Sequence, residues 1–303
     1  MFKGSMVAIV TPFKKGGPAS AGKIDEKAYE GLINFHIQSG THGIVPCGTT
    51  GESATLTQEE HLRVIELTVK IAGGKIPVIA GTGSNCTEEA IFFTRHARQL
   101  GADGSLVITP YYNKPTQEGL FQHYQAVAKA VDLPLILYNV PGRTSVNLLP
   151  ATVARLMAFD NIVGIKEGTG SLQQISDLVQ LCGTRCAILS GDDFTAFPTM
   201  AVGGVGTISV TANIVPAEMA EMMNAALRGD FTGARKIHEK IYPLHAAMFL
   251  ETNPVPVKAA LALMGKCPDE VRLPLCRLST KNQETLTKML KRYGLIGKKR
   301  GAQ

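Results

Sequence analysis

Eight short apolar segments alternate with amphipathic segments along the first two thirds of the chain. They begin about 30 residues apart on average, the length of one strand, one helix and their connections. Most are apolar throughout, as expected for parallel strands buried on both faces. This pattern predicts a (β/α)8 barrel. The predicted strands are residues 7–11, 43–46, 77–80, 105–108, 135–138, 162–166, 187–189 and 206–210.

A doubly wound open sheet is the alternative fold for such a pattern. Sheets of this kind that bind dinucleotides carry a Gly-x-Gly-x-x-Gly turn after a strand. Gly81-Thr82-Gly83 begins such a turn but does not complete it. The sequence therefore favours the barrel.

Helix-start signals follow several of the predicted strands. Thr87 and Thr116 each stand at the start of an amphipathic segment and are expected to cap its amino terminus, and Ser171 is expected to begin another helix. Pro150 is expected at the first position of another helix, where its missing N–H costs nothing. A short helix is predicted at 194–201.

Strand-like segments stop after about residue 211, and helical segments follow. These are predicted at residues 216–228, 231–249, 254–264 and 280–293. We therefore divide the chain into a catalytic barrel (1–225), a carboxyl-terminal helical extension (226–296) and a basic tail (297–303) expected to be disordered. The extension should pack on the barrel, because no Ser/Gly-rich linker separates them.

The charge pattern argues against nucleic acid as a partner. The net charge is +6, and part of it comes from Lys298, Lys299 and Arg300 in the terminal tail. The rest of the chain has no basic stripe with interleaved aromatic residues. A mild attraction for small anionic substrates is the simpler explanation of the net positive charge.

Cysteine and histidine positions argue against a metal site or a disulfide framework. The six cysteines form no Cys-x-x-Cys pair, which fits reduced thiols in a cytoplasm. The seven histidines are scattered, so no metal site is expected. The amino terminus lacks the apolar core of a signal peptide, and no segment is long enough to cross a membrane. We therefore expect a cytoplasmic protein without a membrane partner.

The segment 161–170, Asn-Ile-Val-Gly-Ile-Lys-Glu-Gly-Thr-Gly, places a lysine at the carboxyl end of a predicted strand. At that end Lys166 can project into a cleft, where a neutral amine can attack a carbonyl carbon. The simpler interpretation is a lysine that reaches solvent or pairs with Glu167. Consecutive strand residues face opposite sides, so we expect Glu167 to point away from the cleft.

The carboxyl ends of barrel strands meet on one rim, where active sites are built. This rim lacks the histidines and carboxylates of a metal-dependent aldolase, the histidine of a Ser-His-Asp triad and a dinucleotide turn. A lysine surrounded by hydroxyl groups suits Schiff-base chemistry, with a tyrosine relaying protons. An arginine and backbone amides could hold carboxylates. The chemistry-bearing residues at the predicted rim are Thr49, Thr50, Tyr111, Tyr112, Tyr138, Arg143 and Lys166.

Each rim residue also has a structural interpretation. Tyr138 could pack at a strand end with its hydroxyl in water, and the threonines of 49–50 could cap the following helix. The tyrosines of 111–112 could belong to an interface, and Arg143 could be a surface charge. Their joint placement on one rim favours function.

Four blocks of sequence resemble the dihydrodipicolinate synthase family. The resemblance extends over about residues 2–295, and the wider superfamily includes N-acetylneuraminate lyase and other pyruvate-dependent aldolases. The blocks are Gly-Thr-Thr-Gly-Glu-Ser (48–53), Tyr-Tyr-Asn (111–113), Tyr-Asn-Val-Pro-Gly-Arg-Thr (138–144) and Gly-Ile-Lys-Glu (164–167).

The resemblance implies a catalytic role for four residues. Lys166 would form a covalent imine with pyruvate, without a cofactor or metal, and Tyr138 would donate and accept protons. Thr49 and Tyr112 would complete a proton relay, with Tyr112 reaching into the site of a neighbouring subunit.

The resemblance also implies the residues that bind substrate. Thr50 would hold the pyruvate carboxylate, and Arg143 would receive the carboxylate of aspartate 4-semialdehyde. Gly191 and Ile208 would line the pocket with backbone groups.

A feedback site for lysine at a subunit interface is a further implication. Gln58 stands where lysine-sensitive relatives have a histidine, whereas Glu89 remains as a counter-charge for an ammonium group. The matching positions are Ser53, Ala54, Gln58, His61, Asn85, Glu89 and Tyr111.

The resemblance thus implies a lyase with the 4-hydroxy-tetrahydrodipicolinate synthase reaction, in the diaminopimelate route to lysine. The alternative is a pyruvate-dependent aldolase for a sugar acid such as N-acetylneuraminate or 2-keto-3-deoxygluconate. A non-catalytic ligand-binding barrel is the third possibility. A homotetramer, a dimer of dimers, is the expected assembly, with a dimer left open.

Overall fold

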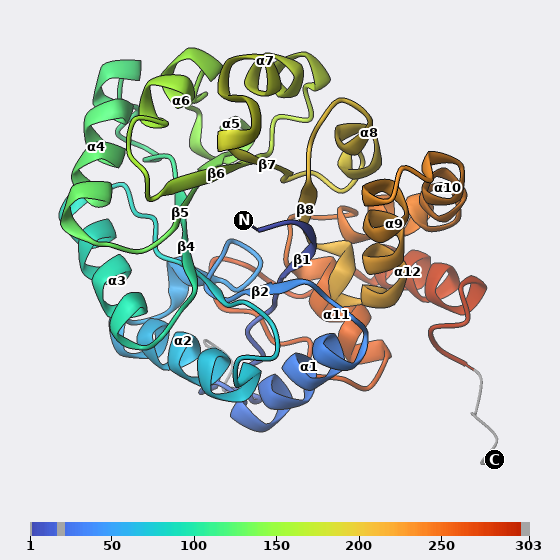
Figure 1. Cartoon of the computed structure of the whole chain (residues 1–303). Helices are drawn as coiled ribbons and strands as arrows, with labels where there is room; N and C mark the ends of the chain where they lie inside the picture. Colours follow the sequence, from blue (N-terminus) through green and yellow to red (C-terminus); the bar gives the residue numbers. More distant parts are fainter. Residues whose placement is uncertain (1, 17–21, 298–303) are drawn as a thin grey trace.

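The protein forms a barrel of parallel strands in the computed structural model, which describes residues 2–16 and 22–297. The ladder runs in the order β2-β1-β8-β7-β6-β5-β4-β3. A parallel bridge between Ile44 and Val78 closes the ring (Figure 1). The predicted (β/α)8 barrel is confirmed. The strands are β1 (Gly4–Ala8), β2 (Gly43–Val45), β3 (Ile79–Gly81), β4 (Gly104–Ile108), β5 (Leu135–Asn139), β6 (Ile162–Glu167), β7 (Ala187–Ser190) and β8 (Gly206–Ser209).

Helices surround the strands as an outer ring (Figure 1). The short helix α5 (Pro141–Thr144) directly follows β5 and carries Arg143. The helices of the ring are α1 (Glu26–Gln38), α2 (Gln58–Ala72), α3 (Thr87–Gln99), α4 (Gln117–Ala130), α6 (Pro150–Leu156), α7 (Leu172–Cys182), α8 (Ala196–Ala201) and α9 (Pro216–Leu227).

The helix-start predictions are confirmed in three cases and wrong in one. The side chains of Thr116 and Ser171 each accept a backbone N–H at the start of their helices, and Pro150 opens α6. Thr87 is instead the first residue of α3 and does not cap it. Its hydroxyl is hydrogen-bonded to Nδ1 of His123 on α4, 2.9 Å away, and is therefore engaged elsewhere.

The first strand begins and ends earlier than predicted. It covers Gly4–Ala8 rather than 7–11, because its register pairs Gly4 with Gly206 of β8. Beyond Ala8 the chain leaves the sheet toward the rim, where the Thr11 hydroxyl donates to the carbonyl of Gly51 at 2.8 Å. This extension brings the first strand into contact with the turn after β2.

Two hydrophobic cores result from this arrangement. The larger core lies between the strands and the outer helices. Strand residues alternate in direction, so those facing inward form a smaller core inside the barrel. Its buried members are Met6, Ala8, Val45, Ile79, Leu106, Ile136, Tyr138, Leu189 and Ile208.

Within the described residues, three further helices follow α9 and pack beside the barrel: α10 (Phe231–Met248), α11 (Val255–Leu263) and α12 (Thr280–Arg292). Helix α9 contacts both β1 and α10, and it continues to Leu227, so the predicted boundary at 225 falls inside its last turn. The division into barrel and extension stays a prediction. The predicted tail lies outside the described residues, apart from Gly297.

Candidate active site

Lys166 and Tyr138 lie side by side near the carboxyl ends of β6 and β5. They are register partners in the parallel ladder, and the Lys166 Nζ lies 4.2 Å from the centroid of the Tyr138 ring. Only 5% of Lys166 and 7% of Tyr138 is exposed. Within the part of the chain that the structure describes, Lys166 has no ion pair. The amine therefore faces a phenol without a carboxylate beside it.

Glu167 faces away from Lys166, as expected for consecutive residues of a strand. Its Oε2 accepts hydrogen bonds from Asn139 Nδ2 and Gln174 Nε2, both at 3.0 Å. Gln174 belongs to α7, so the carboxylate is directed toward the outer helices. The simpler interpretation of a Lys166–Glu167 pair is wrong.

Gly191 approaches the stem of Lys166 closely. Its N–H donates to the carbonyl of Glu167 at 2.6 Å. A Cβ atom at this position would lie 3.1 Å from Lys166 Cε and 3.1 Å from Gly168 Cα. A side chain here would therefore crowd the lysine.

Thr49 and Thr50 lie in the turn that follows β2. They do not cap the next long helix, because Thr57 caps α2 in a reciprocal pair with Glu60. The alternative interpretation of these two residues is therefore wrong. Thr50 is 2% exposed, and its Oγ1 accepts a hydrogen bond from Asn253 Nδ2 at 3.0 Å.

Two adjoining cavities open at this end of the barrel. A small one of about 40 Å³ is lined by Thr49 and Tyr138, among others. A larger one of about 440 Å³ is lined by Thr49, Arg143 and Asn253. The Nη2 of Arg143 donates to the backbone carbonyl of Asn253 at 3.2 Å. The cavities thus connect the tyrosine of the predicted relay to the arginine predicted to bind a carboxylate.

The larger cavity also contains most of the predicted lysine site. Asn85 is the exception, and its carbonyl accepts from the Asn113 side chain at 2.9 Å. The lining residues from the predicted set are Ser53, Ala54, Gln58, His61, Glu89 and Tyr111.

His61 is a buried ring that lines this cavity. Its Nε2 donates to the carbonyl of Gly81 at 2.7 Å, and the ring stacks on Phe93 with centroids 4.2 Å apart. Burial lowers the pKa of His61, so the positive form is disfavoured. Glu89 accepts a short hydrogen bond from the Ser84 hydroxyl. Glu89 and Glu52 are the two acidic residues that line this cavity.

The structure does not bring Tyr112 to the other predicted catalytic residues. Its side chain is 90% exposed in the single chain, and its backbone has a φ of 71°. A positive φ in a bulky residue is a strained conformation that clusters at functional sites. Ile208, by contrast, is buried inside the barrel on β8.

A buried ion pair next to the larger cavity was not predicted from the sequence. Lys258 Nζ lies 2.5 Å from Glu52 Oε1 and donates to the carbonyl of Thr11 at 2.8 Å. Arg272 adds a backbone N–H to Glu52 Oε2 at 3.0 Å. One signal was available, because Lys258 is the only charged residue of α11. Asn253, at the start of that helix, gave no comparable signal.

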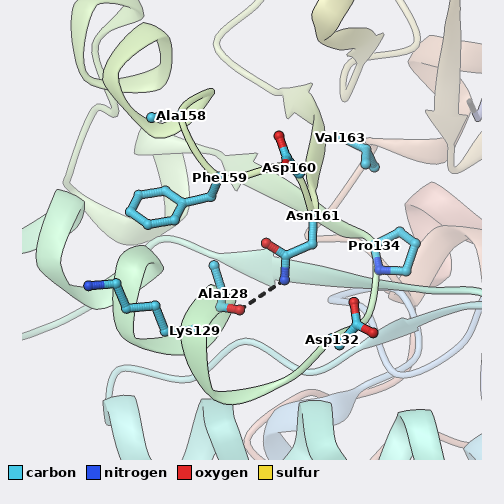
Figure 2. Close-up of a pocket in the computed structure, with 9 residues that line it drawn as sticks. All are labelled: Ala128, Lys129, Asp132, Pro134, Ala158, Phe159, Asp160, Asn161 and Val163. Carbon is cyan, nitrogen blue, oxygen red and sulfur yellow. Dashed lines mark hydrogen bonds between the residues drawn. The ribbon is translucent and has the colours of Figure 1, made fainter.

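A third cavity, of about 610 Å³, lies at the opposite end of the barrel (Figure 2). It is formed where β5 and β6 begin, and Asn161 there donates to the carbonyl of Ala128 at 2.9 Å. Lys166 lies at the other end of β6. Since the amino-terminal face of such a barrel serves stability rather than chemistry, this cavity is not the candidate active site.

Neither a membrane segment nor a metal cluster is found among the described residues. No helix there is long and apolar enough to span a bilayer. No group of three or more metal-ligating side chains occurs in the same residues.

The barrel fold and the buried lysine at a strand end are typical of a barrel enzyme that uses Schiff-base chemistry. The chain belongs to the dihydrodipicolinate synthetase family, whose model matches residues 1–293. A 4-hydroxy-tetrahydrodipicolinate synthase from Thermodesulfovibrio yellowstonii is 62% identical, over 98% of this chain and all of the relative.

Solved structures agree with this assignment. A chloride-inhibited dihydrodipicolinate synthase from Acinetobacter baumannii, complexed with pyruvate, is 49% identical, with a TM-score of 0.95 over 98% of this chain and 100% of the other. The lysine-bound enzyme from Cyanidioschyzon merolae is 38% identical, with a TM-score of 0.93 over 97% and 99%. The predicted family, lyase class and place in lysine biosynthesis are confirmed, and the synthase is favoured over the sugar-acid aldolase.

Proposed function

We propose that this chain condenses pyruvate with aspartate 4-semialdehyde through an imine on Lys166. The observation that carries the proposal is the Lys166 amine, 4.2 Å from the Tyr138 ring centroid and without a carboxylate partner among the described residues. An amine held this way is available as a nucleophile, and the neighbouring hydroxyl can move protons.

The proposed reaction uses the lysine twice. Lys166 Nζ attacks the ketone carbon of pyruvate, and loss of water from the carbinolamine gives the imine. A methyl proton then leaves, and the resulting enamine carbon attacks the aldehyde. The amino group of the second substrate finally attacks the imine carbon, which closes the ring and releases Lys166. Tyr138, with Thr49 beside the same small cavity, would carry the protons. The chemistry uses no cofactor or metal.

A different residue is proposed to donate hydrogen bonds to the carboxylate of each substrate. Thr50 is a buried hydroxyl near the rim, suited to the compact pyruvate. Arg143 lies on the larger cavity, where its guanidinium can bind a second carboxylate through two parallel hydrogen bonds. Gly191 and Ile208 would line the pocket around the pyruvate.

Trapping the imine tests the central step. Borohydride added with pyruvate should leave a stable adduct on the peptide that contains Lys166, detected by mass spectrometry. An unmodified Lys166 under these conditions contradicts the mechanism.

Replacing Arg143 tests the choice of second substrate. Arg143→Ala should reduce turnover of aspartate semialdehyde far more than it reduces pyruvate imine formation. Arg155→Ala, which removes an exposed arginine from α6, is the matched control. Equal turnover of a sugar acid by the unmodified protein would favour the alternative aldolase.

We further propose that the larger cavity binds lysine as a regulator. The lysine-bound relative from Cyanidioschyzon merolae supports this, as does Glu89 as a counter-charge in the cavity. Calorimetric titration with lysine should show binding that Glu89→Gln abolishes. The same titration measures the affinity for lysine of a site that has Gln58 in place of the histidine of lysine-sensitive relatives.

A homotetramer, built as a dimer of dimers in the cytoplasm, is the proposed assembly. The exposed, strained Tyr112 supports a neighbouring subunit over this rim. Free cysteines among the described residues are consistent with the cytoplasm. Analytical sedimentation should give the mass of four chains, and a monomer would contradict the assembly.

A further inference from the structure

We propose that Asn253 is a positioning residue that links the two carboxylate subsites of the reaction. The inference rests on the proposed function. Asn253 lies in the segment between α10 and α11. It contacts both residues that are predicted to bind substrate carboxylates, Thr50 and Arg143. Its side-chain Nδ2 donates to Thr50 Oγ1 at 3.0 Å, and its backbone carbonyl accepts from Arg143 Nη2 at 3.2 Å.

The bond to Thr50 determines the direction in which that hydroxyl donates. A threonine hydroxyl has one proton and can accept as well. The Asn253 amide occupies an accepting position, and no described protein group accepts the Thr50 proton. The proton therefore remains available for a carboxylate bound at the rim.

The bond to Arg143 restricts a side chain that is otherwise exposed. Arg143 lies in the last turn of the four-residue helix α5. One guanidinium nitrogen is fixed on the Asn253 carbonyl, and the remaining N–H groups can bind a substrate carboxylate. One residue of the extension thus sets the orientation of two groups on separate barrel loops.

The surroundings of Asn253 support a functional rather than a packing role. Only 5% of the residue is exposed, and its Oδ1 is buried without a partner among the described residues. A buried unsatisfied acceptor destabilises a protein, and an apolar side chain of similar size would avoid this. The bond that Nδ2 makes to Thr50 explains why an amide stands here.

A double-mutant cycle on pyruvate binding tests this link. Asn253→Ala should raise the pyruvate KM about fivefold to tenfold, with a smaller change in kcat, because the hydroxyl loses its orientation. Thr50→Val should raise the KM at least as much. If Asn253 acts through Thr50, the double variant should be no worse than Thr50→Val alone. Multiplying effects would overturn the proposal.

Asn253→Asp provides a second variant that keeps the size of the side chain. Its carboxylate accepts the Thr50 proton instead of donating, so the pyruvate KM should rise again. An unchanged pyruvate KM in this variant would overturn the inference. Asn282→Ala, which removes an asparagine bonded to Glu251 elsewhere in the extension, is the matched control and should leave the KM unchanged.

Borohydride trapping of the unmodified protein distinguishes a failure of the Asn253 role from a failure of the proposed function. A pyruvate adduct on Lys166 combined with multiplying effects overturns the role of Asn253 alone. Absence of the adduct overturns the proposed function and this inference with it. Thermal unfolding midpoints of all variants, measured alongside, show whether a KM change reflects loss of the fold.

Discussion

Lys166 and Lys258 both lie buried, each with its amine 4.2 Å from the centroid of an aromatic ring. The ring is Tyr138 for one lysine and Phe13 for the other. Lys258 also has Glu52 at 2.5 Å, whereas Lys166 has no carboxylate partner among the described residues. Burial lowers the pKa of Lys258, an effect that the Glu52 carboxylate opposes.

The difference shows what distinguishes a reactive lysine from a structural one. Burial and a neighbouring ring are common to both. The structural amine donates hydrogen bonds to two fixed groups, the carbonyl of Thr11 and the carboxylate of Glu52. The candidate catalytic amine faces the ring of a tyrosine, whose hydroxyl can exchange protons, and no carboxylate among the described residues pairs with it. The four experiments below test this contrast, from the largest expected effect to the smallest.

Replacing Lys166 should have the largest effect, and on activity alone. Lys166→Met should reduce kcat at least about ten-thousandfold, because the imine cannot form. The free energy of unfolding should stay unchanged or rise, since a buried unpaired amine is removed. Steady-state kinetics and urea unfolding measure the two quantities. A large loss of stability would show that Lys166 also has a structural role.

Replacing Lys258 should affect stability first. Lys258→Met leaves the Glu52 carboxylate buried without its partner, which should reduce the free energy of unfolding by about 3–5 kcal/mol. Urea unfolding checks the value. The double variant Glu52→Gln with Lys258→Met should recover much of the loss, because no charge is left buried. A stable single variant would contradict the distinction between the two lysines.

Replacing Tyr138 makes the two rings alike. Tyr138→Phe gives Lys166 the same kind of ring that Lys258 has, and kcat should fall about a hundredfold as proton transfer is lost. Stability should change little, because the ring and its packing remain. Tyr242→Phe, on the exposed side of α10, is the control. Unchanged turnover in Tyr138→Phe would mean that another group carries the protons.

The ion pairs around Lys258 should also make the free energy of unfolding depend on pH, and this is the smallest of the four effects. Arg272 hydrogen-bonds both oxygens of Glu60 and lowers the pKa of that carboxyl. This stabilisation is complete above the unfolded pKa of about 4.3 and is lost as the pH falls through the lower folded value. Glu60→Gln should therefore reduce the stability lost between neutral and acid pH by about 1 kcal/mol. Urea unfolding at several pH values measures it, and an unchanged pH dependence would contradict it.

Much of the fold and of the site could be predicted because local pattern encodes it. Apolar segments and their spacing predicted all eight strands, seven of them close to their observed positions, and the position of Lys166 at a strand end followed from the same pattern. Thr87 was assigned wrongly because its hydroxyl hydrogen-bonds to His123 on a different helix. The first strand was misplaced because its limits depend on pairing with β8, which no local signal contains.

The sequence by itself determined the alternation of strands and helices and the chemistry carried at the strand ends. These depend on residues close together in the chain, where periodicity and turn residues act directly. Only the tertiary structure decided which lysine is paired and which residue connects Thr50 to Arg143. Glu52 and Lys258 are 206 positions apart, and Thr50 and Asn253 are 203 apart. Such contacts arise from the packing of the extension on the rim, because burial and distance across that packing choose the partners.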